Sequence, residues 1–141
     1  SRVSDATRVM PIGHSPAALA EPGPQDLDNE PLIAPTQRHA RRGQLDRILA
    51  QARSSPKIVA EVSTSFAALD LAREGLGIAV INPFPVIHTQ TDTLAFRPFA
   101  SPLRYQSYFA VPGQRPVSRV DRSFMRHIRL HTPADPFSRP G

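Results

Sequence analysis

The chain has 141 residues, 40% of them hydrophobic and 21% charged, which is the size and balance of about one globular domain. It contains no cysteine, so a disulfide scaffold, a cysteine nucleophile and a thiolate zinc site are all excluded. Neither a basic and apolar leader nor an apolar run near the roughly 18 residues that span a bilayer is visible. We therefore expect a cytoplasmic protein with no membrane partner.

The formal net charge of +5 comes from arginine, because Lys57 is the one lysine among the 17 basic residues. A basic balance is one signature of nucleic-acid binding. The alternative is that the arginines lie on solvated helix faces. We favour this alternative because the sequence has no basic run with interleaved aromatic residues.

Short strands and proline-rich connections are predicted for the first third of the chain. Arg8–Pro11 is a short strand that stops at a proline, and residues 12–24 form a connector rich in Pro, Gly and Ala. Residues 25–29 predict a helical turn, and Leu32–Ala34 predicts a second short strand. Residues 35–42 then form a loop between a strand and a helix.

A helix follows this loop. Its apolar residues fall at positions i, i+3, i+4 and i+7, which predicts one buried stripe: Leu45, Ile48, Leu49 and Ala52. Residues 54–56 end the helix, and Lys57–Val62 predicts the next strand.

Residues 61–84 predict a strand, a helix and a second strand. Ser63 or Ser65 can cap the helix through its hydroxyl, and Gly75 supplies the left-handed position after its end. Ile78–Ile81 is an uninterrupted apolar run, as expected of a strand covered by helices on both faces of a parallel sheet. The fold class indicated is therefore α/β.

Ser63, Thr64 and Ser65 bring three hydroxyls to the start of this helix, where the helix dipole favours a carboxylate or a phosphate. Ligands of open α/β sheets bind at the carboxyl ends of the strands, and the loop of residues 35–42 is predicted to open on the same edge. The alternative for each hydroxyl is that it only caps the helix. Both readings stay open on the sequence.

The last third of the chain predicts two strands and a helix. Residues 83–93 have no clean period and predict a short helical turn, whereas Leu94–Phe99 and Arg104–Val111 alternate like strands. Residues 132–141 are rich in proline and poor in apolar residues, so we expect a disordered tail.

A final helix is predicted from Ser118, with Asp121 completing a capping box. Its apolar stripe, expected to be buried, consists of Val120, Phe124 and Ile128. The opposite face carries a row of arginines, which we interpret as a solvated surface in preference to a DNA contact: Arg119, Arg122, Arg126 and Arg129.

No catalytic or metal-binding motif is visible. His127 and His131 lie one helical turn apart, but no third ligand accompanies them, so we expect no metal site. Glu61 and Asp70 have no evident partner for general acid–base catalysis. We therefore expect neither enzymatic activity nor a cofactor.

Several segments, taken together, resemble the effector-binding domain of LysR-type transcriptional regulators. In chain order they are RVMPIGHSPAALAE, DLDNEPLIAP, EVSTSFAALDLAREGLGIAVINP, LAFRPF and SYFAVP, followed by a closing helix. The resemblance covers residues 8–130. It implies a fold of periplasmic-binding-protein type II, with two α/β lobes and a small-molecule inducer in the cleft between them. It also implies a homo-oligomer, either a dimer or a tetramer.

The sequence departs from this family because nothing before Arg8 corresponds to a helix-turn-helix domain, a linker helix or the first half of lobe one. We therefore expect one complete lobe and the C-terminal part of a second. The expected units are residues 1–20 (end of lobe one and crossing segment), 21–101 (lobe two), 102–131 (return into lobe one) and 132–141 (tail). DNA would be bound only through a helix-turn-helix domain missing from this chain.

Carried over by resemblance, the effector contacts fall on two loops and two strands. A polar residue at the end of the central strand, Asn82, indicates a polar inducer, and the helix start indicates one that bears a carboxylate. The candidate ligand-binding residues are Pro35, Thr36, Gln37, Arg41, Ser63, Thr64, Ser65, Asn82 and Ser107.

Two other functions fit the same fold. A solute-binding protein of a transport system is the main alternative, and an enzyme is the third possibility, which the missing acid–base and cofactor motifs disfavour. The upstream gene sequence distinguishes the regulator from the transport protein, because a helix-turn-helix in frame supports a regulator and a secretion signal supports transport.

Overall fold

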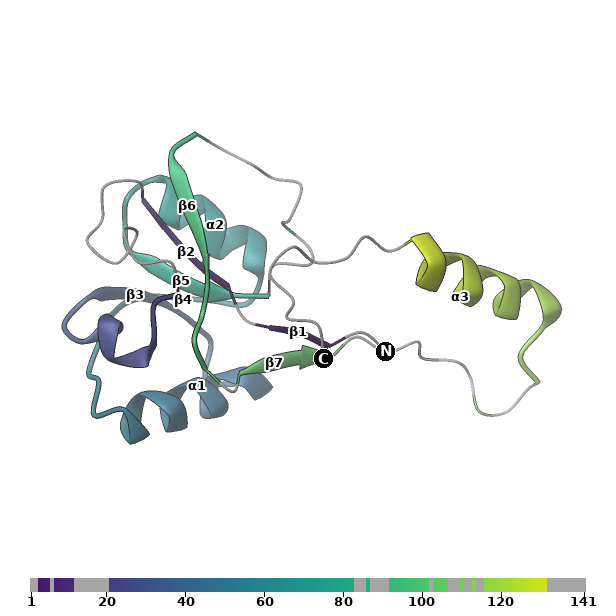
Figure 1. The fold of residues 1–141 in the computed structure, drawn as a ribbon, viewed down its shortest axis with the longest axis horizontal. Helices are drawn as coiled ribbons and strands as arrows, with labels where there is room; N and C mark the ends of the chain where they lie inside the picture. Colours follow the sequence, from purple (N-terminus) through teal and green to yellow (C-terminus); the bar gives the residue numbers. More distant parts are fainter. Residues whose placement is uncertain are drawn as a thin grey trace.

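A computed structural model of the chain describes residues 3–5, 7–11, 21–82, 86, 92–101, 103–106, 110, 113 and 116–131. Strands and helices mix along the chain, as the sequence predicts (Figure 1). In chain order they are β1 (Val3–Asp5), β2 (Thr7–Pro11), the 3-10 helix η2 (Pro24–Leu27), β3 (Pro31–Pro35), α1 (Ala40–Gln51), β4 (Lys57–Val62), α2 (Ser65–Arg73), β5 (Ile78–Ile81), β6 (Leu94–Pro98), β7 (Arg104–Gln106) and α3 (Arg119–His131).

Five strands form one sheet in the order β4-β3-β5-β2-β6. Strand β3 pairs in parallel with β4 and β5, and β2 pairs antiparallel with β5 and β6. The predicted strand–helix–strand unit is confirmed as β4, α2 and β5, with β3 lying between the two strands. Because β3, β4 and β5 run parallel, their carboxyl ends meet at one edge of the sheet.

The assignment of Arg8–Pro11 to the first lobe is wrong. Strand β2 lies inside the five-stranded sheet, where Val9 is opposite both Ala79 of β5 and Phe96 of β6. Strand β1, one residue earlier in the chain, pairs instead with β7 in a separate two-stranded sheet. Both of β2's partners are distant in sequence, so its own residues carry no signal that decides which sheet it joins.

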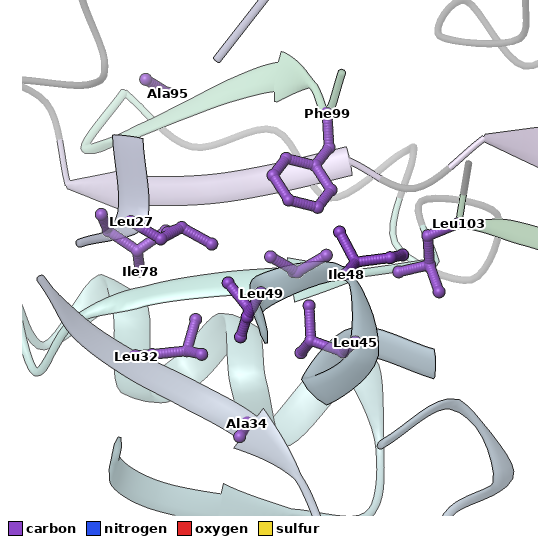
Figure 2. Close-up of a cluster of buried hydrophobic side chains, with 11 residues drawn as sticks. Leu27, Leu32, Ala34, Leu45, Ile48, Leu49, Ile78, Ala95, Phe99 and Leu103 are labelled. Atoms are coloured by element: carbon purple, nitrogen blue, oxygen red, sulfur yellow. The ribbon is translucent and has the colours of Figure 1, made fainter. Parts of the chain in front are cut away.

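Helix α1 covers one face of the five-stranded sheet. Three residues of its predicted stripe are buried there, whereas Ala52 is half-buried and follows the end of the helix. Figure 2 shows side chains of α1 and of the strands gathered in this cluster. Its members are Leu27, Leu32, Ala34, Leu45, Ile48, Leu49, Ile78, Val80, Ala95, Phe99 and Leu103.

Helix α2 covers the other face, and Figure 1 shows the two helices on different sides of the sheet. Alternation along β3 and β5 sends Ile33, Ala79 and Ile81 to this face. They pack there with Ala68, Leu69, Ala72, Val86 and Leu94. All four residues of β5 are buried, as its uninterrupted apolar run predicts.

The ends of α2 match the prediction in part. Gly75 follows the helix with φ +79°, the left-handed conformation expected of it. The N-cap, however, is Thr64, whose hydroxyl accepts a hydrogen bond from the Ala67 N–H at 3.2 Å. The prediction of Ser63 or Ser65 is therefore wrong, because Ser65 is already helical and Thr64 is the last extended residue before it.

Strand β6 confirms the predicted strand from Leu94, and β7 confirms the start of the strand predicted over residues 104–111. Residues 107–109 and 111 lie outside the described part of the chain, and residue 110 is not in a strand. Residues 12–20 of the connector predicted over residues 12–24 also lie outside it, as do the predicted tail over residues 132–141 and most of the turn predicted within residues 83–93.

The capping box of α3 is confirmed. The Ser118 N–H donates to Asp121 Oδ2 at 3.0 Å, and the Asp121 N–H donates to Ser118 Oγ at 3.0 Å. The predicted burial of the apolar stripe is wrong, because Val120 and Phe124 are 76% and 61% exposed. Figure 1 shows α3 apart from the five-stranded sheet. Helical periodicity reveals an apolar stripe, but it does not reveal whether another element covers it.

We expect the first turn of α3 to lose its cap in acid. The hydrogen bonds that Asp121 accepts from the hydroxyl and the N–H of Ser118 hold the pKa of its carboxyl below the ordinary value. A group with a lowered pKa in the folded state stabilises that state at higher pH, and this contribution is lost as the pH falls through the folded pKa. Carbon chemical shifts of residues 118–122, followed by NMR from neutral to acidic pH, measure the loss. An identical pH profile in Asp121→Asn would contradict this assignment.

Candidate functional site

A cavity of about 190 Å³ opens at the edge where β3, β4 and β5 end. It is lined by the ends of these strands, by the loops before α1 and α2 and by the first turns of α2: Ile33, Pro35, His39, Val62, Ser63, Thr64, Ser65, Ala68, Val80, Ile81 and Asn82. Pockets for drug-sized ligands measure about 300–1,000 Å³. This cavity therefore suits a small metabolite.

The cavity brings together five of the nine candidate residues, from three separate segments of the chain. They are Pro35 at the end of β3, Ser63, Thr64 and Ser65 at the start of α2, and Asn82 after β5. The convergence follows from the parallel pairing, which delivers each of these segments to the same edge of the sheet.

Three other candidates are not among the lining residues of the cavity. Thr36 is half-buried, and its N–H donates to the Val62 carbonyl at 3.0 Å, which links the two loops that frame the cavity. Gln37 is exposed. The guanidinium of Arg41 donates along α1 to Gln44 Oε1 at 3.1 Å. Ser107 lies outside the described residues.

The polar side of the cavity is made by the start of α2. Thr64 uses its hydroxyl to cap the helix, whereas Ser63 is exposed and Ser65 is half-buried. The first N–H groups of an α-helix point out of its N-terminus, and the helix dipole adds positive potential there. This arrangement can bind an anionic or hydrogen-bond-accepting group of a small molecule.

His39 lines the cavity and was not predicted from the sequence. It is the N-cap of α1, and its Nδ1 accepts a hydrogen bond from the Arg41 N–H at 3.2 Å. Hydroxyl, carboxylate and amide side chains are the usual helix caps, so an imidazole at this position is not a recognised capping signal. The available signal was the position of a polar residue immediately before the first helical residue.

Arg42 was predicted to lie in the loop of residues 35–42, but it lies in α1 and is 4% exposed. Its Nε donates to Asp46 Oδ1 at 2.9 Å, and its Nη1 donates to the Pro35 carbonyl at 2.8 Å and to Glu61 Oε1 at 2.5 Å. Burial lowers the pKa of this guanidinium, but the hydrogen bonds and charges of Glu61 and Asp46 outweigh it and leave the pKa above its ordinary value. Its spacing from Asp46, one helical turn, was the available signal.

Two further observations concern the described residues alone. No group of three or more His, Cys, Asp or Glu residues among them is arranged to hold a metal ion. No helix among them has both the length and the apolar character that crossing a membrane requires.

Comparison with known proteins identifies relatives that match most of the chain, including the five-stranded sheet. The model of the LysR substrate binding domain matches residues 7–133. The chain is 24% identical over 129 residues to the transcriptional activator protein LysR of Escherichia coli (strain K12). This match covers 92% of the chain and 42% of that relative, so the chain spans less than half of the relative's length.

Three solved structures have the same fold. The CcmR regulatory domain of Synechocystis PCC6803 in complex with 2-PG has a TM-score of 0.74 at 14% identity, over 92% of this chain and 64% of that one. The effector binding domain of QuiR in complex with shikimate has a TM-score of 0.70 at 18% identity, over 92% of this chain and 63% of that one. HinK, a LysR family transcriptional regulator from Pseudomonas aeruginosa, has a TM-score of 0.69 at 15% identity, over 93% of this chain and 46% of that one.

These neighbours are regulatory proteins whose fold matches the predicted periplasmic-binding-protein type II class. The family model extends from β2 through α3, and so includes the five-stranded sheet, the cavity and the two-stranded sheet's strand β7. The chain therefore belongs to the LysR substrate-binding domain family.

Proposed function

We propose that this chain is the effector-sensing domain of a bacterial LysR-type transcriptional regulator and that it binds a small carboxylate-bearing metabolite in the cavity at the start of α2. The observation that carries this proposal is the convergence of Pro35, Ser63, Ser65 and Asn82 around the cavity. Two proteins of the same fold are complexes with small molecules, CcmR with 2-PG and QuiR with shikimate, which supports a small-molecule-binding role for this fold.

The carboxylate would lie against the N-terminus of α2, where the dipole contributes about 0.3–1 kcal/mol for an anion. Hydroxyls of Ser63 and Ser65 and the amide of Asn82 would add hydrogen bonds, since all three residues line the cavity. Thr36, Gln37 and Arg41 lie outside this lining, so they would contact only a part of the ligand that extends beyond the cavity. We also keep, as a proposal, the predicted contact between Ser107 and the ligand.

A binding experiment with matched variants tests the site. Small carboxylates that raise the melting temperature of the protein are first identified by thermal shift, and their affinities are measured by calorimetry. We expect Ser63→Ala and Ser65→Ala each to weaken binding by about 0.5–1.5 kcal/mol per lost hydrogen bond, with little change in melting temperature. Thr64→Ala removes the helix cap, so it should cost about 0.5–2 kcal/mol of folding stability.

The comparison of these variants separates ligand binding from capping. If a ligand stabilises the unmodified protein and its affinity is unchanged in both serine variants, the ligand binds elsewhere and the site assignment is wrong. If Ser63→Ala or Ser65→Ala lowers stability as much as Thr64→Ala does, that serine has a structural role.

For the whole protein we propose a cytoplasmic regulator without enzymatic activity that assembles as a dimer or tetramer and contacts DNA through a helix-turn-helix domain. The relatives are transcriptional regulators, which favours this role over solute transport. We also propose that residues 21–101 belong to the effector-binding lobe, with β2 now added to it, and that residues 102–131 return into the other lobe.

A further inference from the structure

A buried guanidinium, that of Arg42, joins the ends of the two strands whose following loops frame the candidate cavity. Nη1 of Arg42 donates both to the Pro35 carbonyl, at the end of β3, and to Glu61 Oε1, on β4. The side chain of Arg42 is only 5% exposed, whereas the Glu61 carboxylate that it meets is 40% exposed. Charge-assisted hydrogen bonds of this kind are stronger than neutral ones.

Both acceptors are next to the cavity. Pro35 lines it directly, and Glu61 immediately precedes Val62 and Ser63, which also line it. The same two chain segments share a backbone hydrogen bond, from the Thr36 N–H to the Val62 carbonyl at 3.0 Å. The guanidinium therefore adds a side-chain link between two walls that strand pairing and this backbone hydrogen bond already hold together at this edge.

We propose that Arg42 is a positioning residue of the effector cavity: through Pro35 and Glu61 it holds the loop after β3 and the loop after β4 in the arrangement that receives the ligand. The inference rests on the proposed function, because it assumes that the cavity receives an effector. The role of Arg42 in holding the two loops can nevertheless be tested without any ligand. Arginine suits this role because its planar guanidinium presents donors in several fixed directions, whereas a lysine ammonium is a point charge on a flexible stem.

The network contains a matched control for this role. Arg42 also donates to Asp46, but both residues lie in α1, so that ion pair joins no second element. The Glu61 and Asp46 side chains are similarly exposed, at 40% and 46%. Glu61→Ala removes the link to β4, and Asp46→Ala removes a carboxylate partner of the same guanidinium while leaving that link in place.

Hydrogen exchange of the full chain, measured by NMR or mass spectrometry, distinguishes the two variants. We expect Glu61→Ala to speed exchange by about tenfold at the amide of Thr36, which donates to the Val62 carbonyl, and at the neighbouring ladder amides of β3 and β4, because the two segments separate more often. Asp46→Ala should leave these amides within about twofold of the unmodified protein. Glu61→Gln keeps the acceptor oxygen and should restore most of the protection.

Equal exchange at these amides in Glu61→Ala and Asp46→Ala would overturn the proposal, as would acceleration spread evenly over the whole sheet. Melting temperatures of the two variants identify a general loss of stability, which would change exchange in β5 as much as at the cavity. Because no ligand takes part, this result is independent of the binding experiment: the loops can be held by Arg42 even if the effector binds elsewhere.

Discussion

Leu69→Ala is expected to destabilise the protein by about 2–5 kcal/mol, the range for truncating a leucine in a packed core. Leu69 lies on α2, is 1% exposed and belongs to the cluster that contains Ile33 and Ile81. Its loss leaves a void between the helix and the two central parallel strands, which the strands cannot fill without breaking their pairing. Chemical denaturation followed by circular dichroism measures the change in the free energy of unfolding.

Leu76→Ala is the matched control for this substitution. Leu76 lies just beyond α2 and is 42% exposed, so the same truncation removes much less buried surface and should cost under about 1 kcal/mol. Similar losses in the two variants would mean that α2 is not packed on the sheet as described. A loss in Leu69→Ala alone would support the buried face of α2.

Gly77→Ala is expected to cost about 1–3 kcal/mol through a steric clash at the start of β5. A Cβ at Gly77 would lie 2.6 Å from the Pro31 carbonyl oxygen and 3.0 Å from its carbonyl carbon. Those atoms belong to the backbone of β3, where Pro31 is opposite Lys57 in the sheet, so they cannot move without disturbing the pairing. Thermal denaturation measures the effect.

Gly43→Ala should have the opposite sign. Gly43 lies in α1, and no heavy atom outside its own helix is within 4 Å of a Cβ built there. Alanine favours an exposed helical position over glycine by about 0.5–1 kcal/mol, so this variant should be more stable than the unmodified protein. A stabilising Gly77→Ala would contradict the close approach of β5 to Pro31.

Much of the five-stranded sheet was predictable because its signals are local. The spacing of Leu45, Ile48 and Leu49 fixes the face that α1 buries, and the apolar run of β5 requires cover on both sides. The convergence of the candidate site was predictable for a related reason, since loops that follow parallel strands reach the same edge of a sheet.

The features that were missed depend on contacts between distant segments or on the phase of a helix. The sheet that β2 joins is decided by its partners β5 and β6, which lie far along the chain. Arg41 and Arg42 are adjacent in sequence, but Arg42 falls three residues before Leu45, on the buried side of α1, so it is the one that enters the interior. Residues 35–42 were predicted to be a loop, so the phase of the stripe was not extended back to Arg42.

The single residue between β1 and β2 limits how the two sheets can move relative to each other. Asp5 pairs with β7 in the two-stranded sheet, and Thr7 pairs within the five-stranded sheet. Two successive Cα steps span at most about 7 Å, so the ends of these strands cannot slide apart by more than that. Any large rearrangement between the sheets must therefore be a rotation about this short tether.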